Sequence, residues 1–281
     1  MVAGAMGHYR HLRQTPAPAI CGVDTGPPHE GNTGQGVVLH TTLGPIKAML
    51  HQSAQGGARA VLWAWGARGG YAGPAAGIFA QLAEAFSAQG LTSLRLHYRH
   101  PGVYVESVLD VRAGLAFLQG RGCARVVLVG HSFGGAVVIA AGTLTDQVVA
   151  VVALSLQTYG AQGAVSVAPR PLLLVHGLAD TRLSPSCARQ IYQWADEPKE
   201  LVFYPGAEHG LRECQGNCMP CCADGYRRSW ALSEQWCGYG ALRCTQHQRV
   251  QRSLTIAEPD GFLEEDGHGQ YACEPAPGKL L

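Results

Sequence analysis

Between residues 59 and 206, short apolar runs alternate with longer segments whose apolar residues recur at helical spacing. A short continuous apolar run is typical of a strand that is covered on both faces. Strands that alternate with helices in this way predict an α/β fold, with a mostly parallel sheet and helices on both faces. The strand-like runs are 59–65, 91–98, 125–130, 148–156, 170–177 and 199–206, and the helix-like segments are 75–90, 103–120, 136–144 and 184–195.

An earlier pair of apolar runs, GVVLHTTLGPIKAMLHQ, flanks Leu43-Gly44-Pro45 and indicates an antiparallel hairpin. With this pair, the predicted sheet has about eight strands. Ligands of such sheets bind outside the carboxyl ends of the strands, so these loops are where chemistry is expected. The loops in question follow Trp65, Tyr98, Gly130, His176 and Tyr204.

One of these loops carries the pentapeptide Gly130-His131-Ser132-Phe133-Gly134, which fits the pattern G-x-S-x-G. In a nucleophile elbow, this pattern joins a strand to a helix and holds the serine on a strained turn. The alternative is that Ser132 only caps the helix that follows, which is a common use of serine. The context of a strand, a turn and a helix favours the nucleophile.

A serine hydroxyl needs a base, and the base needs an orienting carboxylate. Asp180 lies in the loop after one buried run, and His209 in the loop after the last run. Glu208 is the alternative acid, but it adjoins His209 in sequence and is poorly placed to face it. Two other histidines are weaker candidates for the base: we expect His131 to pack beside the strand ends and His176 to support the acid loop.

The three blocks GHSFGG, HGLADTRLSP and GAEHGL together resemble those of the α/β-hydrolases, in particular small cap-less esterases of the dienelactone-hydrolase-like kind. The resemblance covers roughly residues 37 to 212. It implies an α/β-hydrolase fold with Ser132 as nucleophile, Asp180 as orienting acid and His209 as general base and acid. Dienelactone hydrolases proper have a cysteine where this chain has Ser132.

The resemblance also implies an oxyanion hole made by two backbone N–H groups. One is the N–H of Phe133 in the elbow. The other is expected from the loop WGARGG, where Trp65 replaces the usual histidine and Ala67 is the predicted donor, with Gly66 as the alternative. An ordinary flexible glycine loop is the competing reading of this segment.

Only QTYGAQGAVSVAP separates the run that ends near Leu156 from the one that begins at Arg170, so an open site without a lid is expected. Three arginines fall in loops at the predicted site edge: Arg68, Arg99 and Arg182. A guanidinium matches the geometry of a carboxylate, which makes these residues candidates for binding an anionic substrate group. The alternative is that all three are simply solvated.

The net charge of +1 gives no electrostatic footprint for nucleic acid or for an anionic membrane. The N-terminal sequence lacks the apolar core of a secretory signal, and no apolar run is long enough to span a bilayer. We therefore expect a cytoplasmic protein whose partner is a small-molecule substrate. The oligomeric state is left open.

Composition divides the chain into three predicted regions. Residues 1–35 form a poorly ordered leader, residues 36–212 the hydrolase domain, and residues 213–281 an atypical tail that is first rich in cysteine and then irregular. The tail cysteines do not form two clean Cys-x-x-Cys pairs, so no metal and no cofactor is predicted. The clustered cysteines are Cys214, Cys218, Cys221, Cys222, Cys237 and Cys244.

The sequence thus predicts a serine hydrolase that cleaves carboxylic ester or related acyl bonds through an acyl-enzyme. Two alternatives remain open. One is a non-catalytic binding or interaction protein with a hydrolase fold, whose atypical tail leaves the histidine loop too loose. The other is an acyltransferase that uses the same three residues with an acceptor other than water.

Overall fold

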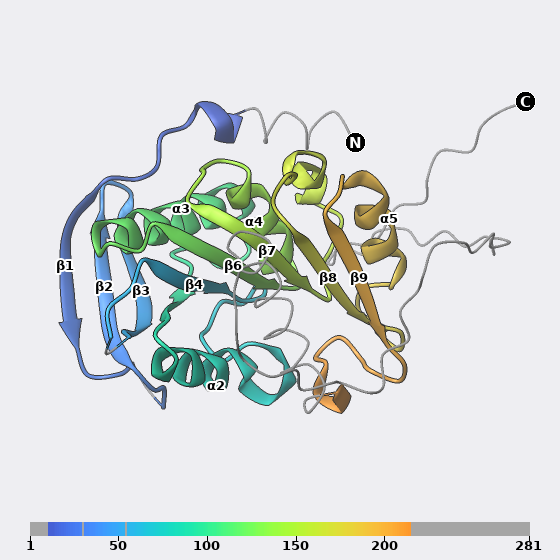
Figure 1. Ribbon diagram of the computed structural model, residues 1–281, viewed down its shortest axis with the longest axis horizontal. Coiled ribbons are helices and arrows are strands. Elements are labelled where there is room, and N and C mark those ends of the chain that lie inside the picture. Colours follow the sequence, from blue (N-terminus) through green and yellow to red (C-terminus); the bar gives the residue numbers. More distant parts are fainter. Residues whose placement is uncertain (1–10, 30, 54, 215–281) are drawn as a thin grey trace, which may run out of the picture.

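One nine-stranded β-sheet dominates residues 11–29, 31–53 and 55–214, which are the residues that this computed structural model describes (Figure 1). Its strand order is β1-β2-β3-β5-β4-β6-β7-β8-β9. The strands are β1 (Ile20–Gly26), β2 (Gln35–Thr41), β3 (Gly44–His51), β4 (Arg59–Ala64), β5 (Thr92–His97), β6 (Arg125–His131), β7 (Val148–Leu154), β8 (Leu172–Gly177) and β9 (Lys199–Tyr204).

The sheet has a parallel part and an antiparallel extension. Strands β4 to β9 run parallel to one another, whereas β1, β2 and β3 pair in antiparallel fashion and β3 joins β5. The parallel strands carry continuous apolar runs because both of their faces are covered. The predicted α/β class, the mostly parallel sheet and the antiparallel hairpin, which is β2 and β3, are confirmed.

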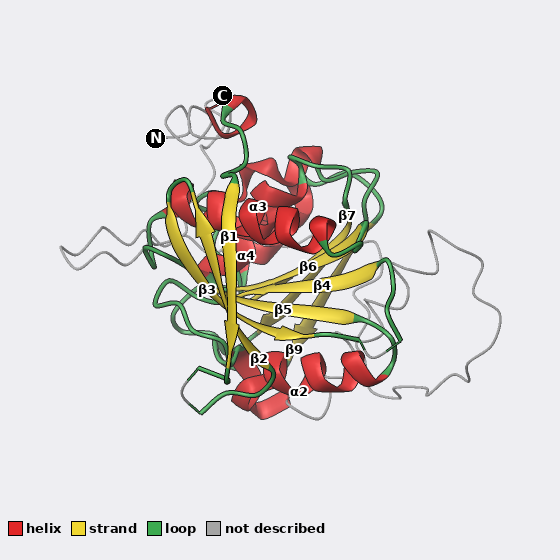
Figure 2. Cartoon of the chain, turned by 90° about the vertical axis from the view of Figure 1, so that its left-hand side faces the viewer, coloured by secondary structure: helices red, strands yellow, loops and turns green. Residues whose placement is uncertain are grey.

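Helices cover both faces of the sheet (Figure 2). The helices α3 (Tyr104–Gly120), α4 (Phe133–Gly142) and α5 (Ser186–Trp194) lie on one face, and α2 (Pro74–Ala88) lies on the other. Successive residues of a strand point to opposite faces, so Leu128 of β6 joins the core under α3 and α4, while Val127 and Val129 join the core over α2.

The described part of the predicted leader is structured, which corrects the expectation for residues 1–35. Residues 11–14 are helical, and the Leu12 side chain is fully buried. Strand β1 pairs with β2 along its length, and it is the strand by which the sheet exceeds the predicted eight. Most side chains of β1 are exposed, so its sequence lacks the apolar alternation that marks a half-buried strand.

The connection from β7 to β8 contains one short 3-10 helix, η1 (Ala161–Ser166), and no inserted helical cap. This agrees with the expected absence of a lid. None of the helices in the described residues is long and apolar enough to cross a membrane. The described chain ends in a second 3-10 helix, η2 (Arg212–Cys214), so the cysteine cluster beyond Cys214 lies outside the described residues.

Candidate active site

Ser132 occupies a sharp turn between β6 and α4. Its backbone has φ 57° and ψ −124°, a conformation that is strained for a residue with a side chain. The glycines on either side make the turn possible, because a Cβ atom at Gly130 would lie 2.2 Å from the Gly134 carbonyl oxygen, and one at Gly134 would lie 2.2 Å from the Trp65 carbonyl oxygen. The Ser132 side chain makes no helix-capping hydrogen bond, so the simple cap is the weaker interpretation.

The side chain of Ser132 instead begins a continuous hydrogen-bonded chain. Its Oγ lies 3.0 Å from Nε2 of His209, and Nδ1 of His209 lies 2.8 Å from Oδ2 of Asp180. A carboxylate only accepts, so Nδ1 carries the hydrogen and Nε2 of the neutral ring is free to accept from the serine hydroxyl. The His209 side chain is 14% exposed and the Asp180 side chain is fully buried.

Buried hydrogen-bond donors hold the Asp180 carboxylate in place. Oδ1 accepts the backbone N–H groups of Arg182 and Leu183, both at 2.9 Å, and Oδ2 lies 3.1 Å from Nε2 of the fully buried His176. Burial alone would raise the pKa of Asp180, but the bonds from His176, His209 and the Leu183 backbone outweigh it and hold the pKa below its ordinary value. Asp180 is therefore an anion at neutral pH.

His176 thus supports the acid loop as the sequence predicted, since its Nε2 also lies 3.0 Å from the Leu183 carbonyl oxygen. Glu208, the alternative acid, is exposed. Two further histidines near this edge, His97 at the end of β5 and His100 just after it, lie apart from the hydrogen-bonded chain. His97 donates from Nδ1 to the Tyr98 carbonyl at 2.9 Å, and His100 is exposed beside Glu106.

The loop after β4 lies beside the elbow because β4 and β6 are neighbours in the sheet, with Ala64 opposite Gly130. A Cβ atom at Gly66 would lie 3.8 Å from Cβ of Ser132, and the Gly69 N–H closes a tight turn by donating to the Gly66 carbonyl at 2.9 Å. The structure therefore brings the predicted Gly66–Ala67 segment to the nucleophile, with Ala67 itself exposed.

The second predicted donor, the Phe133 N–H, belongs to the first turn of α4, where backbone N–H groups have no intrahelical acceptor. Phe133 packs edge-on against Tyr98, with ring centroids 5.9 Å apart. The Tyr98 hydroxyl in turn donates to the Trp65 carbonyl at 3.0 Å. Sequence reasoning missed Tyr98, whose only signal was a hydroxyl-bearing residue at the end of a buried strand.

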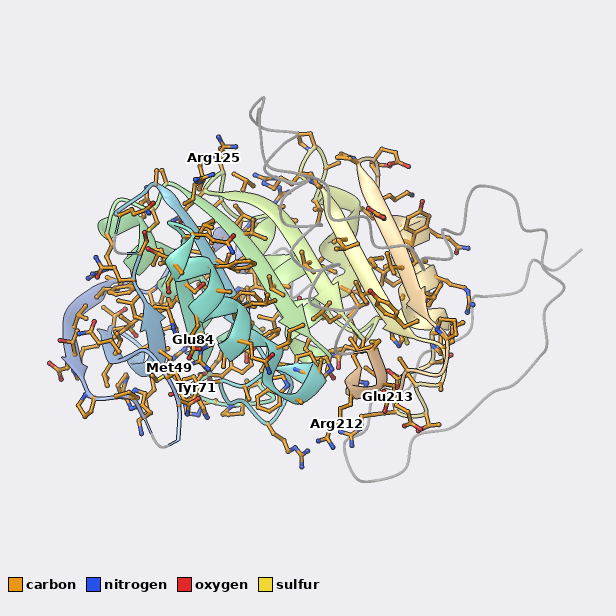
Figure 3. The ribbon with its side chains drawn as sticks, turned by 60° about the horizontal axis from the view of Figure 1, so that its bottom comes forward. Met49, Tyr71, Glu84, Arg125, Arg212 and Glu213 are labelled. Carbon is orange, nitrogen blue, oxygen red and sulfur yellow. The ribbon has the colours of Figure 1, made fainter. Side chains whose placement is uncertain are left out.

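A buried arginine fixes the far end of the same loop, and sequence reasoning missed it too. Arg95 of β5 is fully buried, and its guanidinium donates to the backbone carbonyls of Tyr71 at 3.0 Å and Thr33 at 2.7 Å. Tyr71 is labelled in Figure 3. The signal in the sequence was a single charged residue inside the apolar run LTSLRLHY, where burial requires partners.

The three predicted arginines have different environments. The Arg99 side chain is 5% exposed, and its Nε donates to Oδ1 of the fully buried Asp110 at 2.5 Å, while the Arg99 backbone N–H donates to Oδ2 of the same residue at 2.8 Å. This buried ion pair occupies the guanidinium, which corrects the expectation that Arg99 is a substrate-binding residue. Arg68 and Arg182 are exposed and remain candidates.

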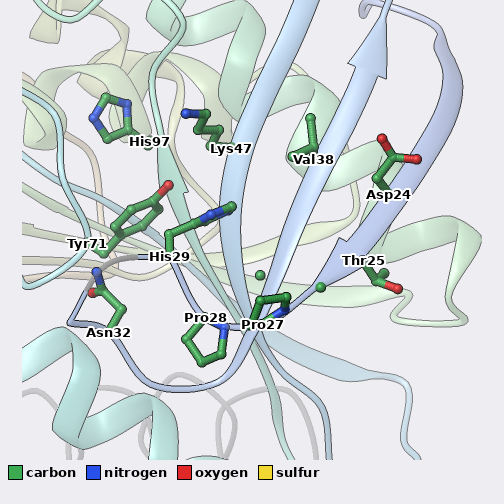
Figure 4. A pocket seen from close by; sticks show the side chains of 12 residues that line it. Asp24, Thr25, Pro27, Pro28, His29, Asn32, Val38, Lys47, Tyr71 and His97 are labelled. Carbon is green, nitrogen blue, oxygen red and sulfur yellow. The ribbon is translucent and has the colours of Figure 1, made fainter.

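A cavity of about 700 Å³ lies away from the hydrogen-bonded chain, against the antiparallel extension (Figure 4). None of Ser132, Asp180 and His209 lines it. Its size alone therefore does not mark the reacting centre. The lining residues are Asp24, Thr25, Gly26, Pro27, Pro28, His29, Asn32, Gly36, Val38, Lys47, Tyr71 and His97.

Comparison with curated proteins gives little on function. No protein-family model matches this chain. It is 46% identical over 44 residues to the uncharacterized protein YfhR of Escherichia coli strain K12, and to that of E. coli O157:H7. The chain spans only 16% of the length of these relatives.

Solved structures match most of the described chain. An α/β hydrolase from a Penicillium species has a TM-score of 0.59 at 14% identity, covering 72% of this chain and 99% of that one. The esterase domain of a Rhodothermus marinus protein has a TM-score of 0.58 at 18% identity, covering 74% of this chain and 98% of that one. A serine hydrolase without lid from Xanthomonas campestris has a TM-score of 0.53 at 18% identity, covering 72% of this chain and 97% of that one. The chain has the α/β-hydrolase fold.

Proposed function

We propose that this protein is a serine hydrolase that cleaves carboxylic ester or related acyl bonds of a small molecule. The observation that carries the proposal is the unbroken hydrogen-bonded chain from Ser132 Oγ through His209 to Asp180, on a turn that presents the serine. Side chains from the ends of three strands converge there, in the arrangement that nucleophilic acyl transfer requires.

In the proposed reaction, Ser132 Oγ attacks the carbonyl carbon as its proton passes to Nε2 of His209. Asp180 accepts from Nδ1 and stabilises the imidazolium that forms. His209 then gives the proton to the leaving alcohol, and the acyl group stays on Ser132. A water molecule attacks the acyl-enzyme by the same route, releases the acid and restores the serine.

The negative charge of the tetrahedral intermediate falls on the former carbonyl oxygen. We propose that the Phe133 and Ala67 N–H groups stabilise it, with Gly66 as the alternative to Ala67. Two observations support this role: the loop after β4 adjoins the elbow, and the Tyr98 hydroxyl holds that loop through the Trp65 carbonyl. Donors that are fixed in advance need no reorganisation when the charge develops.

The open site and two exposed arginines are the basis of the proposed substrate class, which is esters with an acidic part. Ser132 is partly exposed, and the β7–β8 connection places no helical cap over it. Arg68 and Arg182 are the exposed guanidinium groups proposed to favour esters with an acidic part. If this is right, Arg68→Ala or Arg182→Ala raises KM for acidic esters relative to neutral esters of the same length, and an unchanged ratio in both variants removes the idea.

The test of the proposed function is labelling with a fluorophosphonate, followed by turnover of short-chain aryl esters, thioesters and lactones. We expect the wild-type protein to be labelled, Ser132→Ala not to be labelled, and at least one ester class to be hydrolysed. No difference in labelling between the two proteins contradicts the enzyme and leaves a binding protein with this fold. Labelling with turnover only when an alcohol or amine acceptor is added indicates an acyltransferase.

A further inference from the structure

The loop that carries His209 is held by hydrogen bonds to its backbone carbonyls. The Ala207 carbonyl accepts the Ala179 N–H at 3.0 Å, and the Gly210 carbonyl accepts the Ala75 N–H, at the start of α2, at 2.7 Å. Between them, the His209 carbonyl oxygen lies 2.9 Å from Nε2 of His131. His131 is therefore the side-chain donor among these three contacts, and the one that a substitution can remove.

Downstream of His209, the described chain also supports the loop: the Leu211 N–H donates to the Glu208 carbonyl at 2.9 Å, and Leu211 is fully buried. The Glu208 N–H donates to the Glu213 carboxylate at 3.1 Å, and both of these residues are exposed. Figure 3 labels Arg212 and Glu213 on the last described turn, η2. On the elbow side, His131 supplies a side-chain hydrogen bond to the carbonyl oxygen of the base itself, whereas the shielded contacts downstream are made by backbone atoms and apolar side chains.

The chemistry of the His131 ring suits a fixed donor. A carbonyl oxygen only accepts, so Nε2 carries the hydrogen, and Nδ1 is a buried atom without a hydrogen-bond partner among the described residues. Burial, and then the proximity of His209, lower the pKa of His131 to about 3. The ring is therefore neutral throughout the range in which a serine–histidine pair works.

Neutrality matters because the ring of His131 lies against that of His209, with centroids 4.9 Å apart and planes at 51°. His209 becomes a cation during each proposed proton transfer, and a second cation at this distance would oppose that step. The charged and titratable groups that influence His131 are His209, Asp180 and His176. Of these, Asp180 is the anion that favours the His209 imidazolium.

We propose that His131 is a positioning residue for the general base: its Nε2–H anchors the His209 carbonyl and keeps the imidazole within reach of Ser132. The inference rests on the proposed function. Ser132 follows His131 directly in the chain, so a single turn presents the nucleophile and, one residue earlier, fixes the base. A shift of about 1 Å in such a group costs on the order of 10²-fold in rate.

The test compares His131→Gln with His131→Met. The glutamine amide N–H reaches about as far as the imidazole Nε2–H, whereas methionine has similar length and no donor. We expect His131→Met to lower kcat and the fluorophosphonate labelling rate by about 10- to 100-fold, with KM changed less than about twofold. His131→Gln should recover most of this loss. A wild-type rate in His131→Met, or an equally low rate in both variants, overturns the inference.

A second measurement separates this inference from the proposed function. The Nδ1 proton that His209 donates to Asp180 should give a low-field proton resonance in the NMR spectrum of the wild type. We expect the signal to persist in His131→Gln and to be lost by exchange with water in His131→Met. If the wild type is not labelled, the hydrolase proposal fails, while this signal still decides whether His131 fixes His209. A sharp signal in His131→Met contradicts the anchor.

Discussion

The two parts of the sheet use polar side chains in opposite ways. At the carboxyl edge of the parallel strands, the side chains of Asp180 and His176 are fully buried, and hydrogen bonds of His209 join Asp180 to Ser132. In the antiparallel extension, polar groups line the cavity, but Lys47 and Asp24 are exposed. The Asp24 carboxylate pairs with His40 across β1 and β2, both on the surface.

The two parts thus differ in the burial and hydrogen bonding of their polar groups. Exposed charges are solvated and screened, so they hold no fixed geometry. A buried carboxylate with donors on both oxygens has one orientation, and it imposes that orientation on the imidazole beside it. Substitutions placed in each part test whether this difference in burial decides where activity resides.

The largest expected effect is that of Ser132→Ala, which removes the nucleophile. We expect kcat for an aryl ester to fall by about 10⁴- to 10⁶-fold. The matched variant is Lys47→Met, which removes the charge from the cavity of the extension and should leave kcat/KM within about twofold. A loss in Lys47→Met that approaches the loss in Ser132→Ala would move the reacting centre to the cavity and break the comparison.

Asp180→Asn should lower kcat by about 10³- to 10⁴-fold while the protein stays folded. The amide replaces an acceptor with a donor, which favours the imidazole tautomer with hydrogen on Nε2, and that tautomer cannot take the proton of Ser132. Steady-state kinetics with circular dichroism as the folding check measure this. Glu208→Gln is the control for the alternative acid, and activity that depends on Glu208 instead would contradict the assignment.

Arg99→Ala is expected to lower the free energy of unfolding by about 3 to 5 kcal/mol, because it leaves the Asp110 carboxylate buried and unpaired. The Arg99 guanidinium also links the two parts of the sheet, because it donates to the Leu43 carbonyl in the β2–β3 turn at 2.5 Å. The exposed Arg182→Ala should change the same quantity by no more than about 0.5 kcal/mol. Urea unfolding curves test both, and equal effects would contradict the difference in burial.

The smallest expected effect is on acid stability. The pKa of Asp180 is lower in the folded protein than the value of about 3.9 for an unfolded aspartate. Its stabilisation is therefore complete above about pH 5 and is lost as the pH falls below about 4. Below about pH 4, the wild type should lose up to about 1.4 kcal/mol more per pH unit than Asp180→Asn. Identical slopes in the wild type and in Asp180→Asn would contradict the buried anion.

Much of the fold could be predicted from the sequence because the strands covered on both faces carry long apolar runs. Strand β1 could not, because its pairing with β2 uses backbone hydrogen bonds and leaves most of its side chains exposed. The convergence of Ser132, Asp180 and His209 could be anticipated because each follows the carboxyl end of a parallel strand, β6, β8 or β9. Their catalytic roles stay a prediction until activity is measured.

The contacts that could not be predicted from the sequence are those between residues that are distant in the chain or lie on different elements. Arg99 follows a strand, as a substrate-binding residue would, but its partner Asp110 lies on the buried side of α3. His131 packs at the end of β6 as expected, but its bond to the His209 carbonyl, which joins residues 78 apart, was not predicted. Sequence periodicity reports which face a residue occupies, and it does not report which atoms meet there.

The distance along the chain between Ser132 and His209 has a consequence for the timing of activity. The two residues are 77 positions apart, and β7, β8 and β9 lie between them. At a synthesis rate of about 5–20 residues per second, the ribosome adds His209 about 4–15 s after Ser132. Throughout that interval, the nascent chain carries a serine without its base. In the proposed enzyme, reactivity is therefore acquired only after β9 and the loop that carries His209 have been translated.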